Sequence, residues 1–206
     1  MDDLRDLEPL HFDALREVAN IGAGHAATAL SQMIDRTIMI KVPEVSVTPL
    51  EDVPGIIGDP GEVSAAVLMQ MMGDLTGRTL LMFPAESART LCDLLLRRSV
   101  GTTEAYGEME ESALKEVGNI LSSAYLNALS DFLGMMLVPS VPSMVVDYAA
   151  AVLTTTYLTF GSERDVVLCV ETEFDFKDEN ENVPAHFLLL PDMASLRAIF
   201  DAIRLG

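Results

Sequence analysis

The chain has 206 residues, half of them hydrophobic, so it is long enough to bury one core of ordinary size. Its formal net charge of −19 argues against nucleic acid and anionic membranes as partners, because both carry phosphate charge. Without a membrane-length apolar run or a basic leader, and with two cysteines (Cys92 and Cys169) in apolar stretches, we expect a cytoplasmic protein with reduced thiols and no membrane insertion.

The first half of the chain predicts a long helix, three strands and a second helix. Residues 9–33 place a proline in a first turn and then repeat apolar residues at alternating three-four spacing, which is typical of an amphipathic helix. Residues 38–47, 63–72 and 78–83 are β-rich, with a hairpin turn predicted at residues 74–77. Residues 85–97 follow Pro84 and form an amphipathic pattern that predicts a helix.

The second half repeats this order after a linker at residues 98–107. A long helix is predicted from about residue 104 to residue 132, with Gly134 as its stop. Strands are predicted at residues 137–146, 151–160, 166–174 and 186–190, an exposed loop at 175–183, and a closing helix at 192–204.

Both halves read helix, strands, helix, which defines the predicted fold class. We expect an α+β fold in which an internal duplication gives a pseudo-twofold, antiparallel-rich sheet with long amphipathic helices packed on it. Each half is short and mostly apolar, so we expect residues 1–206 to form one domain made of two repeats, about 9–98 and 108–204, and the protein to be a monomer.

A polar motif occurs twice, 99 residues apart, once on each long helix. The first copy contains Asp13, Glu17, Asn20 and Pro43, and the second contains Ser112, Glu116, Asn119 and Pro142 at identical spacings. Several apolar positions between these anchors also match without a gap. The duplicated unit therefore includes a cluster of polar side chains.

The helical period predicts that each triplet faces away from the core. At roughly 100° per residue, Asp13, Glu17 and Asn20 fall within an arc of about 60°. The apolar stripe, which contains Leu15 and Gly22, lies on the opposite side of the wheel. The second triplet has the same geometry. Both triplets are therefore expected on open helix faces.

A solvated helix face is the simplest explanation of such residues, but two features argue for a site. Asn is a mediocre helix former, yet it occupies the same mid-helix register in both copies. Asp13 and Glu17 form a like-charge i,i+4 pair, which costs roughly 0.2–0.5 kcal/mol. Small neighbours of the Asn residues, Ala19 and Gly118 among them, are expected to let another molecule come close.

The motif Asp/Ser-x3-Glu-x2-Asn-x22-Pro resembles the signature of the CheC/CheX/FliY family of chemotaxis phosphatases. The resemblance covers nearly the whole chain, and two copies in about 200 residues is the arrangement of the family's CheC members. It implies hydrolysis of the aspartyl phosphate of the response regulator CheY. The regulator would supply Mg²⁺ and a Lys, so the protein needs no cofactor or metal of its own.

The resemblance also implies roles for the motif residues. Asn20 and Asn119 would orient the attacking water, and Glu17 and Glu116 would each bind the partner's Lys. Asp13 and Ser112 would contact the partner. The family also binds CheD, a receptor deamidase. Pro43 and Pro142 are expected to set the start of a strand rather than to take part in chemistry.

Other readings of the motif remain. Asp13, Glu17 and Asn20 could bind a divalent metal, although three ligands on one exposed helix leave several positions to water. The glycine pair Gly22 and Gly24 lies inside a helix and follows no strand, so close helix packing explains it better than phosphate binding. The main alternative is a non-enzymatic module that sequesters phosphorylated CheY or regulates CheD.

Overall fold

The computed structural model describes residues 9–49, 52–57, 59, 61–158, 166–177 and 180–205. Its helices are α1 (Pro9–Ile34), α2 (Val53–Ile56), α3 (Ala85–Leu95), α4 (Glu108–Leu133), α5 (Ala149–Leu158) and α6 (Met193–Leu205). Its strands are β1 (Ile38–Lys41), β2 (Val45–Pro49), β3 (Val63–Gly73), β4 (Gly77–Pro84), β5 (Leu137–Pro139), β6 (Ser143–Tyr148), β7 (Val166–Phe176) and β8 (Glu181–Pro191).

The strands form one antiparallel sheet in which the two halves of the chain exchange partners. The order is β1-β7-β8-β4-β3-β5, with β2 also paired to β7 and β6 also paired to β3. Each half contributes one hairpin, β3–β4 or β7–β8. The short strands β1 and β2 of the first half pair with β7 of the second, and the short strands β5 and β6 of the second half pair with β3 of the first. The β4–β8 pair joins the hairpins at the centre. The predicted pseudo-twofold α+β fold is confirmed.

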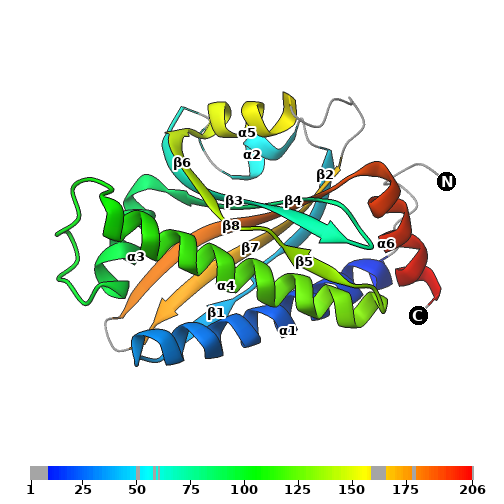
Figure 1. The fold of residues 1–206 in the computed structure, drawn as a ribbon, viewed down its shortest axis with the longest axis horizontal. Helices are drawn as coiled ribbons and strands as arrows, with labels where there is room; N and C mark the ends of the chain where they lie inside the picture. Colours follow the sequence, from blue (N-terminus) through cyan, green and yellow to red (C-terminus); the bar gives the residue numbers. More distant parts are fainter. Residues whose placement is uncertain are drawn as a thin grey trace.

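The helices cover both faces and both ends of this sheet. The two long helices, α1 and α4, lie side by side on one face and run in opposite directions, whereas α2 and α5 lie over the other face (Figure 1). The helices α3 and α6 lie at opposite ends of the long-helix layer (Figure 1). Apolar side chains accordingly form a large core under α1 and α4 and a smaller one under α2 and α5. The long helices thus have one buried face and one open face.

The predicted strand at residues 151–160 is wrong, because this segment belongs to helix α5; residues 159 and 160 lie outside the described part. Its run of Ala, Val and Thr has strand-like composition, but the helix buries Val152, Leu153 and Thr156 against the sheet. The Thr156 hydroxyl donates to the Val152 carbonyl at 2.8 Å, which satisfies it within the helix. Burial against the sheet therefore overrides local propensity.

The predicted loop at residues 175–183 is shorter than expected, and two predicted strands are broken. Strand β7 continues to Phe176 and β8 begins at Glu181, because Phe174 and Phe176 are fully buried in the core despite their polar neighbours. The segments 38–47 and 137–146 are each divided into two short strands, with Pro43 and Pro142 in the connections. A proline cannot donate to a strand ladder, which explains the breaks.

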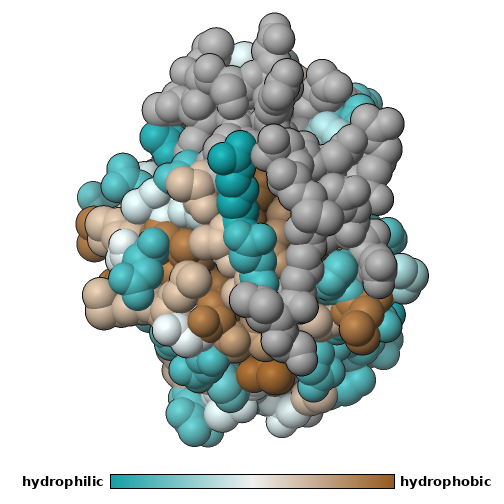
Figure 2. All heavy atoms as spheres, turned by 90° about the vertical axis from the view of Figure 1, so that its right-hand side faces the viewer, coloured by the Kyte–Doolittle hydropathy of each residue, from teal (hydrophilic) through white to brown (hydrophobic). Residues whose placement is uncertain are grey.

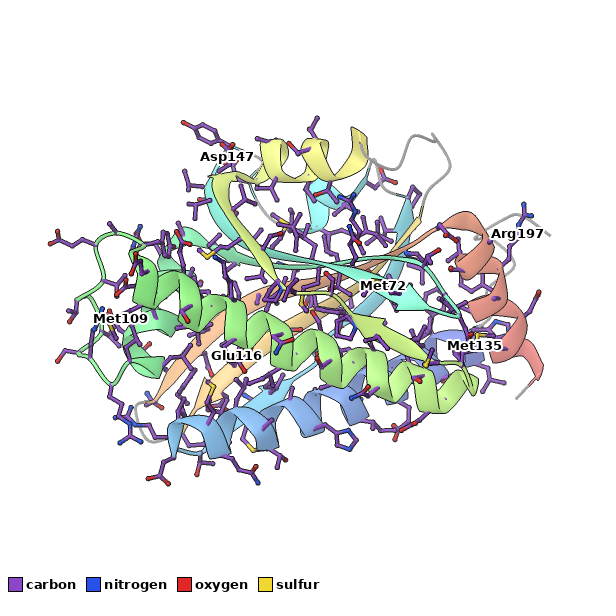
Figure 3. The ribbon with its side chains drawn as sticks, in the orientation of Figure 1. Met72, Met109, Glu116, Met135, Asp147 and Arg197 are labelled. Atoms are coloured by element: carbon purple, nitrogen blue, oxygen red, sulfur yellow. The ribbon has the colours of Figure 1, made fainter. Side chains whose placement is uncertain are left out.

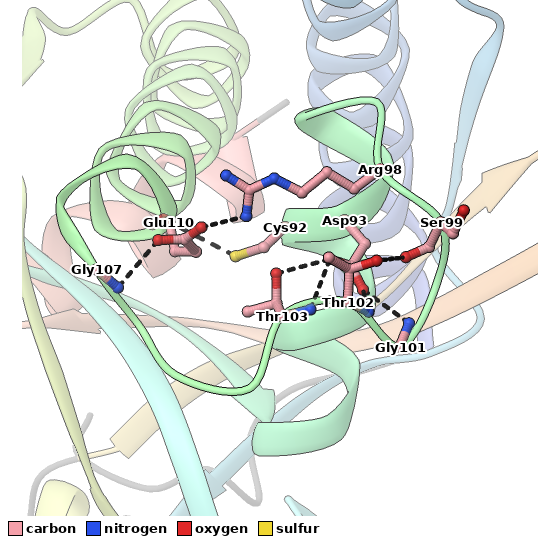
Figure 4. Close-up of polar contacts among 9 residues, drawn as sticks. All are labelled: Cys92, Asp93, Arg98, Ser99, Gly101, Thr102, Thr103, Gly107 and Glu110. Atoms are coloured by element: carbon pink, nitrogen blue, oxygen red, sulfur yellow. Dashed lines mark hydrogen bonds and ion pairs between the residues drawn. The ribbon is translucent and has the colours of Figure 1, made fainter.

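The connection between α3 and α4 is held by a buried carboxylate. Asp93 is 0% exposed, and its oxygens accept N–H bonds from Gly101, Thr102 and Thr103 at 2.8–2.9 Å. The Thr103 hydroxyl donates a further bond at 2.6 Å (Figure 4). Because each donor lies on the linker, Asp93 fixes the path by which the chain enters α4.

Among the described residues, no helix is long and apolar enough to cross a membrane. Viewed from the α6 end, hydrophobic residues reach the surface in separate patches between hydrophilic ones (Figure 2).

Cys92 and Cys169 are both buried and unbonded to each other, as predicted.

Candidate functional site

The second polar triplet lines an open groove beside α4. Ser112 and Glu116 are exposed and Asn119 is half-buried, so all three lie on the open face of the helix, as the helical period predicts. Glu116 projects from the N-terminal half of α4 (Figure 3). The groove has a volume of about 680 Å³, and Pro142 lines it together with the triplet. The structure therefore brings the four residues of the second motif together.

The wall opposite the helix is the connection between β5 and β6. Pro139, Ser140 and Val141 line the groove together with Pro142. Ser140 is tied to β3 twice: its N–H donates to the Gln70 carbonyl at 2.9 Å, and its Oγ accepts the Gln70 N–H at 2.9 Å. A wall bonded in this way keeps a fixed distance from the helix.

The start of α4 is also fixed. Glu110 accepts the Gly107 N–H at 3.0 Å and pairs with Arg98, and this pairing lowers the pKa of its carboxyl below the ordinary value (Figure 4). Carboxylates in the first helical turn also interact favourably with the helix dipole. The helix that carries the triplet therefore begins at a defined residue.

The small residues beside the Asn residues face the sheet and not a visiting molecule, so that expectation is wrong. Gly118 and Ala19 are both buried. A Cβ at Gly118 would lie 2.5 Å from Val67 of β3, so this glycine lets α4 approach the sheet. Access to Asn119 comes instead from the groove that it lines.

The first triplet is also exposed, on α1. Asp13, Glu17 and Asn20 all lie on the open face, and Pro43 is exposed in the connection between β1 and β2. The connection between β1 and β2 differs from its counterpart between β5 and β6. At the position of Ser140 stands Lys41, whose Nζ lies 3.0 Å from Asp175 and 3.4 Å from Glu173 on β7. The two copies therefore share a triplet but differ in the contacts that Lys41 and Ser140 make with the sheet.

The charges around the two triplets also differ. The second groove is lined by three carboxylates, from Glu108, Glu111 and Glu116, and one ammonium, from Lys115. Lys115 lies 3.2 Å from Glu111, an i,i+4 ion pair in the favourable orientation. The positions of Glu108 and Glu111 in the first copy hold uncharged residues, Pro9 and Phe12. The first copy has its own additional carboxylate, Asp13, where the second has Ser112, so the two sites differ in where their charges lie.

Sequence reasoning did not identify the groove-lining residues Lys115, Ser140 and Val141. A weak signal was present, because Val141 matches Val42 in the first copy, next to the motif proline. The position of the loop opposite α4 depends on strand pairing between the halves, which the motif does not encode.

Within the described ranges, no group of three or more His, Cys, Asp or Glu side chains is placed to hold an ion, and the set Asp13, Glu17 and Asn20 contains only two such side chains. His186 lies in β8 and belongs to neither triplet; burial lowers the pKa of its imidazole. Each triplet itself offers a carboxylate and an amide on the open face of its helix.

The fold and the site define a class: an internally repeated α+β protein that presents the same acidic and amide side chains on two antiparallel long helices. A family model described as CheC-like matches residues 10–47 and 109–146, the regions that contain the two motifs. The CheY-P phosphatase CheC of Bacillus subtilis (strain 168) is 33% identical over 194 residues, which is 93% of each chain. The chain belongs to the CheC-like family, as its motifs predict.

Solved structures share the fold. FliY of Thermotoga maritima matches with a TM-score of 0.79 at 22% identity, covering 97% of this chain and 98% of that one. CheX in the CheX-CheY-BeF3-Mg complex from Borrelia burgdorferi matches with a TM-score of 0.51 at 15% identity, covering 88% of this chain and 97% of that one. The second similarity is of interest because that structure contains a CheY.

Proposed function

We propose that the protein hydrolyses the aspartyl phosphate of a CheY-type response regulator at two sites, one on α1 and one on α4. The observation that carries this proposal is the repeated outward presentation of a Glu and an Asn one turn apart, in the second copy beside a groove of about 680 Å³. The name of the B. subtilis relative, a CheY-P phosphatase, supports the same reaction.

Each Asn would hold the attacking water. A carboxamide has both a donor and an acceptor, so it can bind a water molecule in one orientation and aim its lone pair at phosphorus. Phosphoryl transfer passes through a loose transition state, in which positioning matters more than a strong base. Orienting this water should contribute about 10²-fold, roughly 2.7 kcal/mol of the barrier.

Each Glu would bind the partner rather than the water. The carboxylates of Glu17 and Glu116 are exposed and can accept a charge-assisted hydrogen bond from a Lys beside the regulator's phosphorylated Asp. Asp13 and Ser112, one turn earlier, would contact the regulator's surface. The divalent cation belongs to the phosphorylated regulator. The residues of this chain act on the face of the phosphate that the regulator and its cation leave open.

The test replaces both amides. Asn20→Ala with Asn119→Ala should reduce the decay of radiolabelled phosphorylated regulator to its spontaneous rate, while binding of a beryllofluoride-activated regulator persists. The side chains are on open faces, so the urea midpoint should not change. If hydrolysis continues at the original rate while binding is normal, the proposed role of the amides is wrong.

A binding module would give a different pattern. In that case the unaltered protein would bind the activated regulator without accelerating its dephosphorylation. Replacing Asn20 and Asn119 by Ala would then leave the rate of dephosphorylation unchanged. The CheD partnership that the resemblance implies remains a prediction, which a pull-down with purified CheD would test.

A further inference from the structure

Val141 is unusually placed for an apolar side chain. It is 88% exposed, more than any other large hydrophobic residue in the part of the chain that the structure describes. It also lines the groove that contains Glu116 and Asn119. A valine in this position contacts water in the free protein, at the rim of the proposed site.

The loop that carries Val141 is held in one conformation. Pro139 and Pro142 flank it, and each fixes its own backbone φ angle. Two hydrogen bonds fasten the loop to β3: the Ser140 N–H donates to the Gln70 carbonyl, and the Gln70 N–H donates to the Ser140 Oγ, both at 2.9 Å. The valine is therefore presented by a preorganised element, so its contacts with a partner cost little ordering entropy.

The equivalent valine of the first copy is used differently. Val42 is 6% exposed and belongs to the core beneath α1. Its neighbour Lys41 bonds to Glu173 and Asp175 of β7, an arrangement that the second loop does not repeat at Ser140. The same residue type is thus buried at one site and displayed at the other.

We propose that Val141 is a specificity-determining contact of the second site, where it makes an apolar contact with the response regulator docked in the groove. This inference rests on the proposed function, because it takes the occupant of the groove to be the regulator. The contact forms on docking and does not reach the reacting atoms. It therefore acts on KM and regulator affinity, not on kcat.

The test isolates the second site with Asn20→Ala and adds Val141→Ser. We expect KM for the phosphorylated regulator to rise about tenfold while kcat stays within about twofold. Val141→Ile, which keeps the apolar contact, should leave KM within about twofold. The matched control is Val100→Ser, because Val100 is 47% exposed in the α3–α4 linker and does not line the groove.

The complementary background is Asn119→Ala, which leaves only the first site. There Val141→Ser should change neither KM nor kcat. An unchanged KM in the Asn20→Ala background, or an equal rise with Val100→Ser, would overturn the proposal. Titration with beryllofluoride-activated regulator separates the two hypotheses. If the double amide variant still hydrolyses, the proposed function fails, but Val141→Ser still supports the contact when one of the two binding sites becomes about tenfold weaker and the other keeps its affinity.

Discussion

Gly22 of α1 lies directly against Tyr125 of α4. A Cβ at position 22 would lie 2.3 Å from Tyr125 Cδ1 and 3.0 Å from its Cα, so only glycine fits between the helices. The tyrosine ring packs on Phe187 with a centroid distance of 4.6 Å, and its hydroxyl lies 3.4 Å from Thr172 Oγ1. Since the ring is held from the sheet side, the distance between the two long helices is fixed at this point.

Gly22→Ala should therefore destabilise the protein. The added methyl group meets the facing ring and backbone, and overpacking of this kind costs about 1–3 kcal/mol. Urea unfolding followed by circular dichroism measures the change. Gly24→Ala is the matched control: nothing lies within 4 Å of its Cβ position, so the same substitution two residues on should stabilise the helix by about 0.5–1 kcal/mol. Equal midpoints for the two variants would contradict the packing argument.

Asp93→Ala should loosen the connection between α3 and α4. The substitution leaves three N–H donors and one hydroxyl without their acceptor, and we expect a loss of about 3 kcal/mol in the free energy of unfolding. Asp131→Ala removes an exposed carboxylate from α4 and should change stability by less than about 0.5 kcal/mol. Hydrogen exchange of the linker amides should accelerate in the first variant alone.

Glu110 should make stability depend on pH in the acid range. Arg98 lowers the pKa of this carboxyl in the folded state, so its contribution is present above the ordinary value of 4.5 and is lost as pH falls through the folded value. The difference in urea midpoint between the unaltered protein and Glu110→Gln should narrow from about pH 6 to about pH 3. A difference that widens on acidification would show that the sign is wrong.

Cys92 and Cys169 should be unreactive while the protein is folded. Burial raises the pKa of each thiol to about 12, so at pH 8 only about one part in 10⁴ is thiolate. A disulfide reagent should label neither cysteine within minutes under native conditions and both in concentrated guanidinium chloride. Fast native labelling of either one would show that its segment opens.

Glu116→Gln should weaken regulator binding at the second site. The Gln side chain keeps the size of Glu116 but removes its charge. In the Asn20→Ala background, which isolates the second site, we therefore expect KM to rise roughly tenfold. The control Glu104→Gln removes an equally exposed charge from the linker, outside the groove, and should leave KM within about twofold. If both raise KM to the same extent, the effect comes from net charge and not from a specific partner.

The long helices and the exposure of both triplets could be predicted because periodicity determines which face of a helix is buried. The period fails near the end of α1: at roughly 100° per residue Met33 falls on the same side of the wheel as Leu15, but it is 44% exposed. There the buried side follows Ala27, Leu30 and Ile34 instead. Over 26 residues, small departures from the assumed angle accumulate, so the stripe is least reliable far from its reference residue.

The pairing of strands between halves could not be predicted in the same way. Alternation identifies a strand but not its neighbour, and β1 finds its partner in β7, more than 120 residues later. The wall of the second groove follows from this pairing, because Ser140 is bonded to Gln70 of the other half. Helix α5 was missed for a related reason: its stability comes from the sheet beneath it and not from its own sequence.

The exchange of short strands has a consequence for how the chain could be cut and restored. Cleavage in the linker after α3 would leave two fragments, each with a hairpin edge that pairs with the short strands of the other in the intact protein. Two separately expressed fragments should therefore reassemble without a covalent link, as a heterodimer.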